Sequence, residues 1–392
     1  MIGTTKRLGA LILVGAFAFA ACSSSGATTA PSAAASQAAS SAPSAAASDN
    51  GSPAPSMAAA PVPPTAAVTL QGAGATFPTP LYDSWFQTYT GLYSNIQFDY
   101  QSIGSGGGIK AITQQTVDFG ASDAAMKDEE IAALPAGTKL FHFPTALGAV
   151  VMIYNLDGVP NLNLDSANIA GIYLGTITKW NDPTIVANNP GTTLPDEAIL
   201  VVHRSDGSGT TNAFTTYLDT VDPTWHTNVG KGKEVKWPTG VGASGNDGVA
   251  TAVKQTPGAV GYVELNYATA TGLTSASVKN ANGKFVAGST DGVTAAAEAA
   301  AADFPADFRQ APIINGAGDT TYPIASYTYL LVYQDQTDAT KGQALVSFIY
   351  WALTDGQSAE AALGYAPLPA TVDQQALTQL HLVTTGGSPI WP

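Results

Sequence analysis

The sequence predicts an α/β fold with a largely parallel sheet, and two observations support this. Short apolar runs typical of strands alternate with runs whose apolar residues are spaced for one face of a helix, and the alternation is repeated in the second half of the chain. With 392 residues, 45% of them hydrophobic, the chain can bury a large core, and the usual domain size indicates two domains.

The folded body is expected to begin near Val68, and its first half alternates strands with helices. Pro78 suits the first turn of a helix that carries Leu81, Trp85 and Phe86 on one face. After it we expect, in order, a strand over 96–100, a helix opened by the glycine loop 104–108 and reaching Val117, a strand over 117–123, a short helix from Asp128, and two apolar strands over 140–143 and 149–154.

The second half repeats this pattern. We expect a helix from Ile169, a strand over 198–202, helices over 212–218 and 247–255, a strand over 259–263, an alanine-rich surface helix over 295–302, a strand over 327–333, and helices over 344–353 and 357–363.

The N-terminus has the pattern of an export signal. Lys6 and Arg7 precede the apolar stretch Leu8–Ala20, which is too short for a stable membrane span. Cys22, the only cysteine, follows two small residues and resembles the lipid-attachment site of bacterial lipoproteins. We therefore predict a signal peptide over 1–21 and a lipid anchor on Cys22, with an unlipidated protein cut near Ala21 as the alternative.

Residues 22–67 are predicted to be a tether. After Cys22 the segment is almost wholly Ser, Ala, Pro, Gly and Thr, and it lacks the apolar periodicity that would support a core.

The composition excludes some classes of function. The formal charge is −14, which argues against nucleic-acid binding by a broad basic surface, so any anion must be held by local donors. The four histidines have no metal-ligand spacing, and we expect neither a metal nor a cofactor.

The loop Arg204–Thr210 carries the clearest chemical signal. It lies between an apolar strand and a helix, so backbone N–H groups freed by Gly207 and Gly209 can converge with the helix N-terminus and with the hydroxyls of Ser208 and Thr210. The Arg204 guanidinium adds a positive fork. This combination is suited to holding a small oxyanion.

Two further loops lie where a strand passes into a helix: Thr76–Phe77, and Gly104–Gly108 with its Ser105. Ligands of open α/β sheets lie beyond the carboxyl ends of strands, so the three loops could converge. Taken singly, a glycine loop is more often a turn, and Thr76 is more often a helix cap.

The spacing of the residues does not match the enzymatic motifs that the glycine loops and serines resemble. The residues around Lys110 do not form a nucleotide P-loop, and neither Ser105 nor Ser208 fits the hydrolase elbow G-x-S-x-G. We therefore expect a binding protein and no catalysis.

Six motifs in order resemble the phosphate-binding protein of the bacterial phosphate-specific ABC transporter. They are Gly72–Pro78, Gly104–Gly107, Val117–Asp123, Arg204–Thr210, Lys236–Pro238 and Gly258–Glu264. The resemblance implies a two-lobed fold of the periplasmic-binding-protein type, with a mixed, mostly parallel sheet in each lobe and the ligand in the cleft. Lobe I would comprise residues 68–146 and 322–392, and lobe II residues 147–321.

The resemblance also implies the ligand contacts. They are Thr76, the backbone N–H of Phe77, Ser105, Asp123, Arg204, Ser208, Gly209 and Thr210. Asp206 would orient Arg204. Gly106 stands where the family often has a second serine, so that hydroxyl is lost here.

Asp123 would determine which anion binds. Phosphate near neutral pH retains a proton that it can donate to a carboxylate, whereas sulfate would turn a lone pair toward a buried negative charge. A helix cap is the alternative role for Asp123.

We therefore predict a high-affinity receptor for inorganic phosphate that is exported, anchored on the extracytoplasmic face of the cell membrane, and delivers its ligand to an ABC permease. We expect a monomer. A receptor for another protonated oxyanion such as arsenate, a secreted phosphoester hydrolase, and a surface adhesin remain as alternatives.

Overall fold

The computed structural model describes residues 59–392. The predicted signal segment, Cys22 and most of the predicted tether lie outside the described residues. Residues 59–67 run along the folded body, where the side chains of Asn95, Gln343 and Trp391 donate hydrogen bonds to their carbonyl groups. These last residues of the predicted tether are therefore held against the body.

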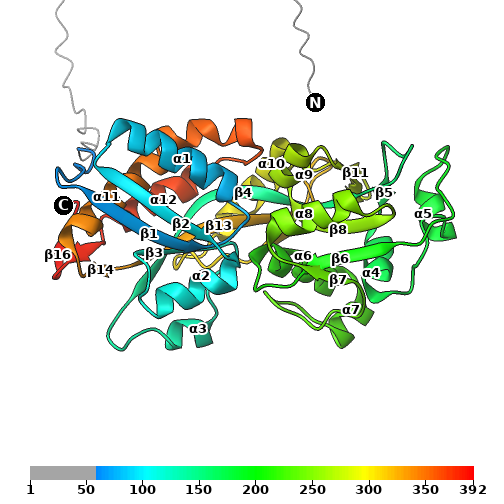
Figure 1. Ribbon diagram of the computed structural model, residues 1–392, viewed down its shortest axis with the longest axis horizontal. Coiled ribbons are helices and arrows are strands. Elements are labelled where there is room, and N and C mark those ends of the chain that lie inside the picture. Colours follow the sequence, from blue (N-terminus) through cyan, green and yellow to red (C-terminus); the bar gives the residue numbers. More distant parts are fainter. Residues whose placement is uncertain (1–58) are drawn as a thin grey trace, which may run out of the picture. The chain divides into compact units, whose positions relative to one another are not determined.

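One sheet of ten strands organises the described residues, and its main path runs β2-β1-β3-β13-β4-β8-β6-β7 (Figure 1). Parallel strands occur at both ends: β2, β1 and β3 at one end, and β8, β6 and β7 at the other. Between them, β13 and β4 pair antiparallel with each other and with their outer neighbours. The predicted α/β fold with a mixed sheet is confirmed.

The first half of the body follows the expected order of elements. They are β1 (Val68–Gly74), α1 (Thr79–Leu92), β2 (Ile96–Ser102), α2 (Gly104–Thr113), β3 (Phe119–Ser122), α3 (Asp128–Ala132) and β4 (Leu140–Tyr154). The glycine loop proved to be the first turns of α2, and that helix ends before Val117, which was expected on it.

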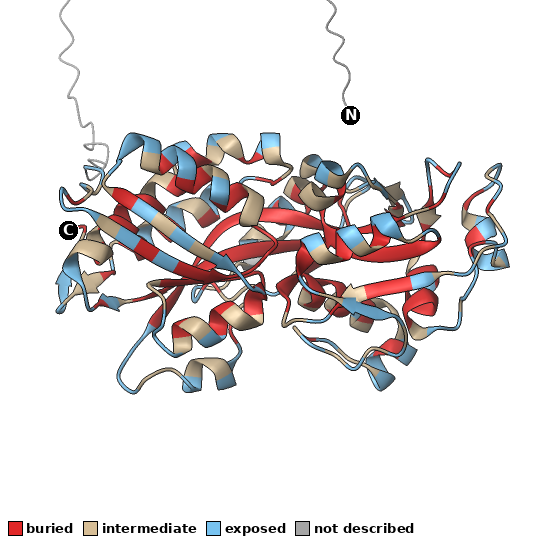
Figure 2. Cartoon of the chain, in the orientation of Figure 1, coloured by how far each residue is buried: buried red, intermediate tan, exposed pale blue. Residues whose placement is uncertain are grey.

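The two apolar strands expected over 140–154 form a single strand, β4, in which every residue is buried. Residues 140–149 pair with β13, apart from a bulge at Thr145, and the last five residues pair with β8, so β4 belongs to both halves of the sheet. Figure 2 shows β4 and β13 buried along their length. The predicted lobe boundary near residue 147 falls within β4, and it stays a prediction.

The second half contains most of the short elements. They are β5 (Asn163–Leu164), α4 (Ser166–Leu174), α5 (Pro183–Asn188), β6 (Leu200–Arg204), α6 (Gly209–Val221), α7 (Pro223–Asn228), β7 (Val241–Ala243), α8 (Gly245–Gln255), β8 (Ala259–Glu264), α9 (Leu265–Thr271), β9 (Thr274–Ser275), β10 (Ser277–Lys279), β11 (Phe285–Val286) and α10 (Thr290–Ala300).

The C-terminal part returns to the first half. Its elements are a 3-10 turn (Ala301–Asp303), β12 (Ile313–Ile314), β13 (Ile324–Tyr333), β14 (Asp335–Gln336), α11 (Ala339–Ala352), two more 3-10 turns (Asp355–Ala359 and Ala361–Leu363), α12 (Ala370–Leu380), β15 (Thr384–Thr385) and β16 (Ser388–Pro389).

Two expectations for the second half of the chain were wrong. The helix expected over 357–363 is a pair of 3-10 turns, and the second turn ends where Gly364 takes a left-handed conformation. The alanine-rich helix α10 is not confined to the surface, because Val293, Ala296 and Ala297 are buried beside β4. Small side chains allow this close packing as readily as they allow exposure.

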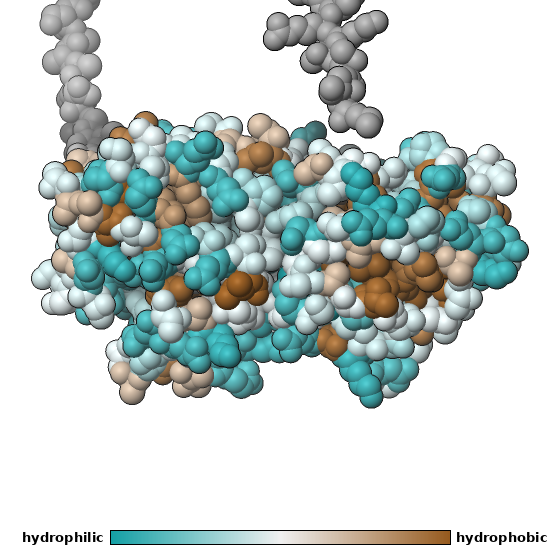
Figure 3. All heavy atoms as spheres, viewed as in Figure 1, coloured by the Kyte–Doolittle hydropathy of each residue, from teal (hydrophilic) through white to brown (hydrophobic). Residues whose placement is uncertain are grey.

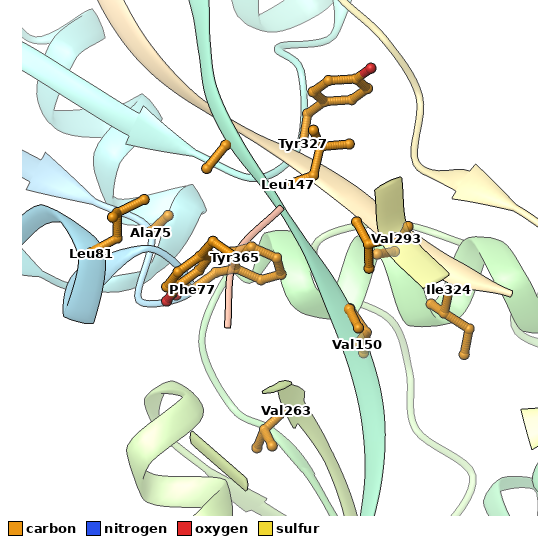
Figure 4. Close-up of a cluster of buried hydrophobic side chains, with 14 of the residues drawn as sticks. Ala75, Phe77, Leu81, Leu147, Val150, Val263, Val293, Ile324, Tyr327 and Tyr365 are labelled. Atoms are coloured by element: carbon orange, nitrogen blue, oxygen red, sulfur yellow. The ribbon is translucent and has the colours of Figure 1, made fainter. Parts of the chain in front are cut away.

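The hydrophobic core is continuous along the central strands. Figure 4 shows Leu147 and Val150 on β4 between the Phe77 and Tyr365 rings on one side and Val293 and Ile324 on the other. Among the described residues, few large apolar side chains are exposed. Leu200 and Val241 are among them, and they lie on β6 and β7 in the half where Figure 3 shows a hydrophobic area. Within residues 59–392, no helix combines the length and apolar character needed to span a membrane.

Candidate oxyanion-binding site

The predicted site residues follow parallel strands at both ends of the sheet. In the first half, β1 leads to Thr76 and β3 leads to Asp123; in the second half, Arg204 ends β6. Because the carboxyl ends of parallel strands meet at one edge, each set gathers in one place. All eight predicted contact residues are buried.

Ser105 joins the two halves. Its Oγ accepts hydrogen bonds from the backbone N–H of Asp123 at 3.1 Å and from that of Gly209, in the other half, at 3.1 Å. Its own hydroxyl donates to Asp123 Oδ2 at 3.2 Å. Ser105 therefore uses all its hydrogen-bonding capacity within the protein, so it can contact an anion only if one of these bonds is exchanged.

Asp123 is a fully enclosed carboxyl group. Besides Ser105, Thr328 on β13 donates to Asp123 Oδ1 at 2.9 Å. Burial raises the pKa of Asp123 to about 7, although the Thr328 hydrogen bond, the positive charge of Arg204 and the Ser105 hydrogen bond each lower it. Asp123 therefore changes charge near neutral pH.

Arg204 is neutralised by its neighbour Asp206. Its Nε donates to Asp206 Oδ1 at 2.8 Å, and Nη2 donates to Oδ2. Burial alone would raise the pKa of Asp206, but the hydrogen bond and charge of Arg204 bring it below its usual value. Arg204 is 3% exposed, and within the described residues its Nη1 is buried without a hydrogen-bond partner. Both N–H groups of Nη1 are thus left for a ligand.

Glycine is required where the halves touch. Gly104 has φ +81°, and a Cβ there would lie 2.3 Å from Asp206 Oδ2. At Gly209 a Cβ would lie 2.5 Å from Asp123 Cβ and 2.7 Å from Ser105 Oγ. The loops also share a direct bond, from Gly106 N–H to Gly207 O at 2.8 Å. These close approaches hold the two loops together.

The start of α6 holds the hydroxyl groups of the second half. Ser208 caps the helix by accepting from the Thr211 N–H at 3.0 Å, so its own proton is free to point elsewhere. Thr210, on the first turn, is fully buried, and its Oγ1 accepts a hydrogen bond from Asn246 at 3.2 Å.

Asn246 also reaches Thr76 in the first half. Thr76 Oγ1 accepts from the Asn246 backbone N–H at 3.2 Å and from its Nδ2 at 2.9 Å. The next residue, Phe77, is fixed by the Tyr365 hydroxyl, which donates to its carbonyl at 2.7 Å. Asn246 therefore connects two predicted contact residues that are far apart in sequence.

The structure brings the eight predicted residues and Asp206 together, whereas Cys22 lies outside the described residues. Which of the eight touch a ligand stays a prediction. Sequence reasoning missed two groups, Asn246 and Thr328. Asn246 had a usable signal, because it opens a helix directly after a glycine-containing loop, as Ser105 does. Thr328 had none, since it lies in an apolar strand.

The arrangement is suited to a small anion. The Nη1 of Arg204 and the hydroxyl protons of Thr76, Ser208 and Thr210 remain as donors, and Asp123 is the carboxyl group among them. Buried donors of this kind bind an oxyanion more strongly than exposed ones. Among residues 59–392, no cluster of three or more His, Cys, Asp and Glu side chains could hold a metal ion.

The two-lobed α/β fold is that of the periplasmic class of binding proteins. The family described as the PBP superfamily domain matches residues 28–355 of the chain. Among solved structures, a high-affinity periplasmic phosphate-binding protein determined with phosphate bound superposes with a TM-score of 0.65 at 22% identity, over 81% of this chain and 99% of that one. This likeness supports the fold.

Two relatives narrow the class. The phosphate-binding protein PstS of Pasteurella multocida is 42% identical over 83% of this chain and 94% of its own length. The PstS protein of Xylella fastidiosa strain 9a5c is 41% identical over 79% of this chain and 84% of its own. The chain belongs to the PstS family of phosphate-binding proteins, which confirms the resemblance that the six motifs indicated.

Proposed function

We propose that this protein binds inorganic phosphate outside the cytoplasmic membrane and delivers it to an ABC-type permease. The observation that carries the proposal is a buried carboxyl group, Asp123, within the same site as the donors of Arg204, Thr76, Ser208 and Thr210. The donors suit any tetrahedral oxyanion. The carboxylate suits one that still carries a proton, because only such an anion can donate to it.

Burial limits the size of the ligand. Ser105 and Thr210 are completely inaccessible, and Thr76, Asp123 and Arg204 are each at most 3% exposed. The closely packed residues leave no exposed surface on which an organic group attached to the anion could lie. We therefore expect phosphate esters to bind far more weakly than inorganic phosphate, which also argues against a phosphoesterase.

Entry requires the two loops to separate. In this arrangement the Gly209 N–H donates to Ser105, so an anion that is to receive the Gly209 N–H must take the place of the Ser105 oxygen. We propose that the halves open about the central strands β4 and β13 and close on the ligand. The ion pair between Lys233 and Glu130, at 2.7 Å, would form again on closing.

We further propose that Cys22 carries the lipid anchor and that the body it attaches to the membrane is monomeric. Globomycin, which blocks lipoprotein signal cleavage, should leave the precursor uncut if Cys22 is the attachment site, and a labelled fatty acid should be incorporated into the parent chain but not into Cys22→Ala. Equal incorporation into both chains, or into neither, would contradict the anchor.

Calorimetric titration of the purified chain tests the ligand. Near pH 8 to 9, where Asp123 is ionised, phosphate should bind one to one with high affinity, sulfate and glycerol phosphate should bind far more weakly, and arsenate, which also carries a proton, should compete. Equal affinities for sulfate and phosphate, or no phosphate binding, would contradict the proposal. Release of phosphate from glycerol phosphate would contradict the expected lack of catalysis.

A further inference from the structure

Asn246 occupies a central and completely buried position behind the predicted site. Its Nδ2 donates to Thr76 Oγ1 at 2.9 Å and to Thr210 Oγ1 at 3.2 Å, so a single amide group reaches both halves of the site. Its backbone N–H makes a further bond to Thr76 Oγ1 at 3.2 Å.

The orientation of this amide is fixed by a third partner. The backbone N–H of Glu264 donates to Asn246 Oδ1 at 3.1 Å. Because a backbone N–H can only donate, it must face the oxygen of the amide, and the nitrogen must then face the two threonines. The direction of the hydrogen bonds follows from chemistry alone.

This direction determines what the two hydroxyl groups can do. A threonine hydroxyl has one proton to donate and two lone pairs that accept. Thr76 Oγ1 already accepts two N–H groups and therefore has no lone pair left for a ligand, whereas its proton is free. Thr210 Oγ1 accepts from the same amide, which favours the same outcome.

We propose that Asn246 is a positioning and specificity-determining residue that holds the Thr76 and Thr210 hydroxyls as donors toward the bound anion. This inference rests on the proposed phosphate binding. With the threonines held as donors and Arg204 able only to donate, the proton of the anion is directed to Asp123. Asn246 thus acts through the two threonines and sets the direction of their bonds without touching the ligand itself.

A double-mutant cycle tests the proposal. Asn246→Leu keeps the side-chain volume but removes the amide, and it should weaken phosphate binding about 10- to 100-fold, because two buried hydroxyls lose their orientation. In a Thr76→Val, Thr210→Val background there is no hydroxyl left to orient, so the same substitution should change Kd by less than about threefold. If Asn246→Leu does not fold, Asn246→Ala takes its place in the cycle.

A second buried amide provides the matched control. Asn189 is 3% exposed, and its Nδ2 donates to the carbonyls of Asn163 and Ile185, in contacts that include none of the predicted site residues. Asn189→Leu should lower the melting temperature and leave the Kd for phosphate unchanged.

The outcomes separate the two proposals. Loss of affinity in the parent background alone supports the positioning role of Asn246. Equal losses in both backgrounds overturn it, because they mean that Asn246 supports the fold and not the hydroxyls. A parent chain that does not bind phosphate overturns the proposed function, and this inference with it.

Discussion

Asp123 and Arg204 are both buried in the predicted site, yet their charges are handled in opposite ways. Arg204 is paired with Asp206 through two hydrogen bonds, so its charge is compensated whether or not a ligand is bound. Asp123 has only neutral side-chain partners, Ser105 and Thr328, and burial raises its pKa to about 7. Arg204 therefore stays charged, whereas the charge of Asp123 depends on whether its carboxyl group is protonated.

This difference suggests that the two residues have separate roles in ligand binding. A compensated arginine whose Nη1 group is still unpaired attracts any oxyanion and does not distinguish sulfate from phosphate. A carboxyl group near its pKa responds to whether the ligand brings a proton. Affinity should therefore depend mainly on the Arg204 loop, and selectivity on Asp123.

The largest effect is expected for Asp123→Asn on selectivity. The amide can donate to sulfate at any pH, so the substitution should keep phosphate binding while the preference for phosphate over sulfate falls by up to about tenfold for each pH unit above 7, or roughly a hundredfold near pH 9. Calorimetric titrations with both anions measure the ratio. An unchanged ratio would remove Asp123 from the selection of the anion.

Arg204→Gln should come next, and its effect should fall on affinity. The variant loses the Nη1 group and leaves the half-buried Asp206 without its cation, which together should cost about 2–4 kcal/mol of binding free energy, or roughly 30- to 1,000-fold in Kd. Phosphate and sulfate should weaken alike. Arg309→Gln is the matched control, because Arg309 pairs with two carboxylates nearer the surface and should leave Kd unchanged.

Gly209→Ala should act on the contact between the two regions. The added Cβ would lie 2.5 Å from Asp123 Cβ, so the loops could not come together as they do here. Overpacking of this kind costs about 1–3 kcal/mol, and phosphate affinity should fall accordingly. Gly248→Ala, where the nearest atom is 3.7 Å away, should leave affinity unaffected. Equal affinities for both variants would contradict the close approach.

The smallest effect concerns a buried carboxyl outside the site. Glu360 is completely buried, and within the described residues neither of its oxygens has a hydrogen-bond partner. Burial and then the charge of Asp373 raise its pKa to about 9. Its folded pKa lies above the unfolded value, so its contribution to stability is present below about pH 4 and is lost as pH rises toward 9.

Glu360→Gln should therefore increase the free energy of unfolding by about 1 kcal/mol or more near pH 8, have little effect near pH 5, and leave phosphate affinity unchanged. Denaturant unfolding at the two pH values checks this. A gain of equal size at both would show that Glu360 is not a titrating group. Glu360 is thus a buried carboxyl group that should affect only stability, whereas Asp123 should affect ligand binding.

Much of this could be read from the sequence because the relevant signals are local. The loops around Thr76, Ser105 and Arg204 combine glycines and hydroxyls where strands pass into helices, and the structure brings them together. The extent of β4 could not be read, because Pro144 and Gly148 look like breaks although the residues on both sides continue one strand. The helix expected over 357–363 failed for a related reason, since a helical pattern of apolar residues does not distinguish α from 3-10 turns.

The sequence analysis also missed two hydrogen-bond partners that lie far from the site residues in sequence. Thr328 reaches Asp123 across 205 residues of sequence, and Asn246 reaches Thr76 across 170. Their roles arise from the pairing of β13 with β3 and from the position of α8 beside the site, and neither is encoded in a local pattern. The raised pKa of Asp123 depends likewise on burial by the whole fold.

The most direct test of the division between Asp123 and Arg204 is the affinity for sulfate as a function of pH. Sulfate carries no proton in this range, so its binding reports the protonation of Asp123. We predict that sulfate affinity is level below about pH 7 and falls by up to about tenfold per unit above it, and that Asp123→Asn removes this dependence. A sulfate affinity that does not change between about pH 6 and pH 9 would contradict the account.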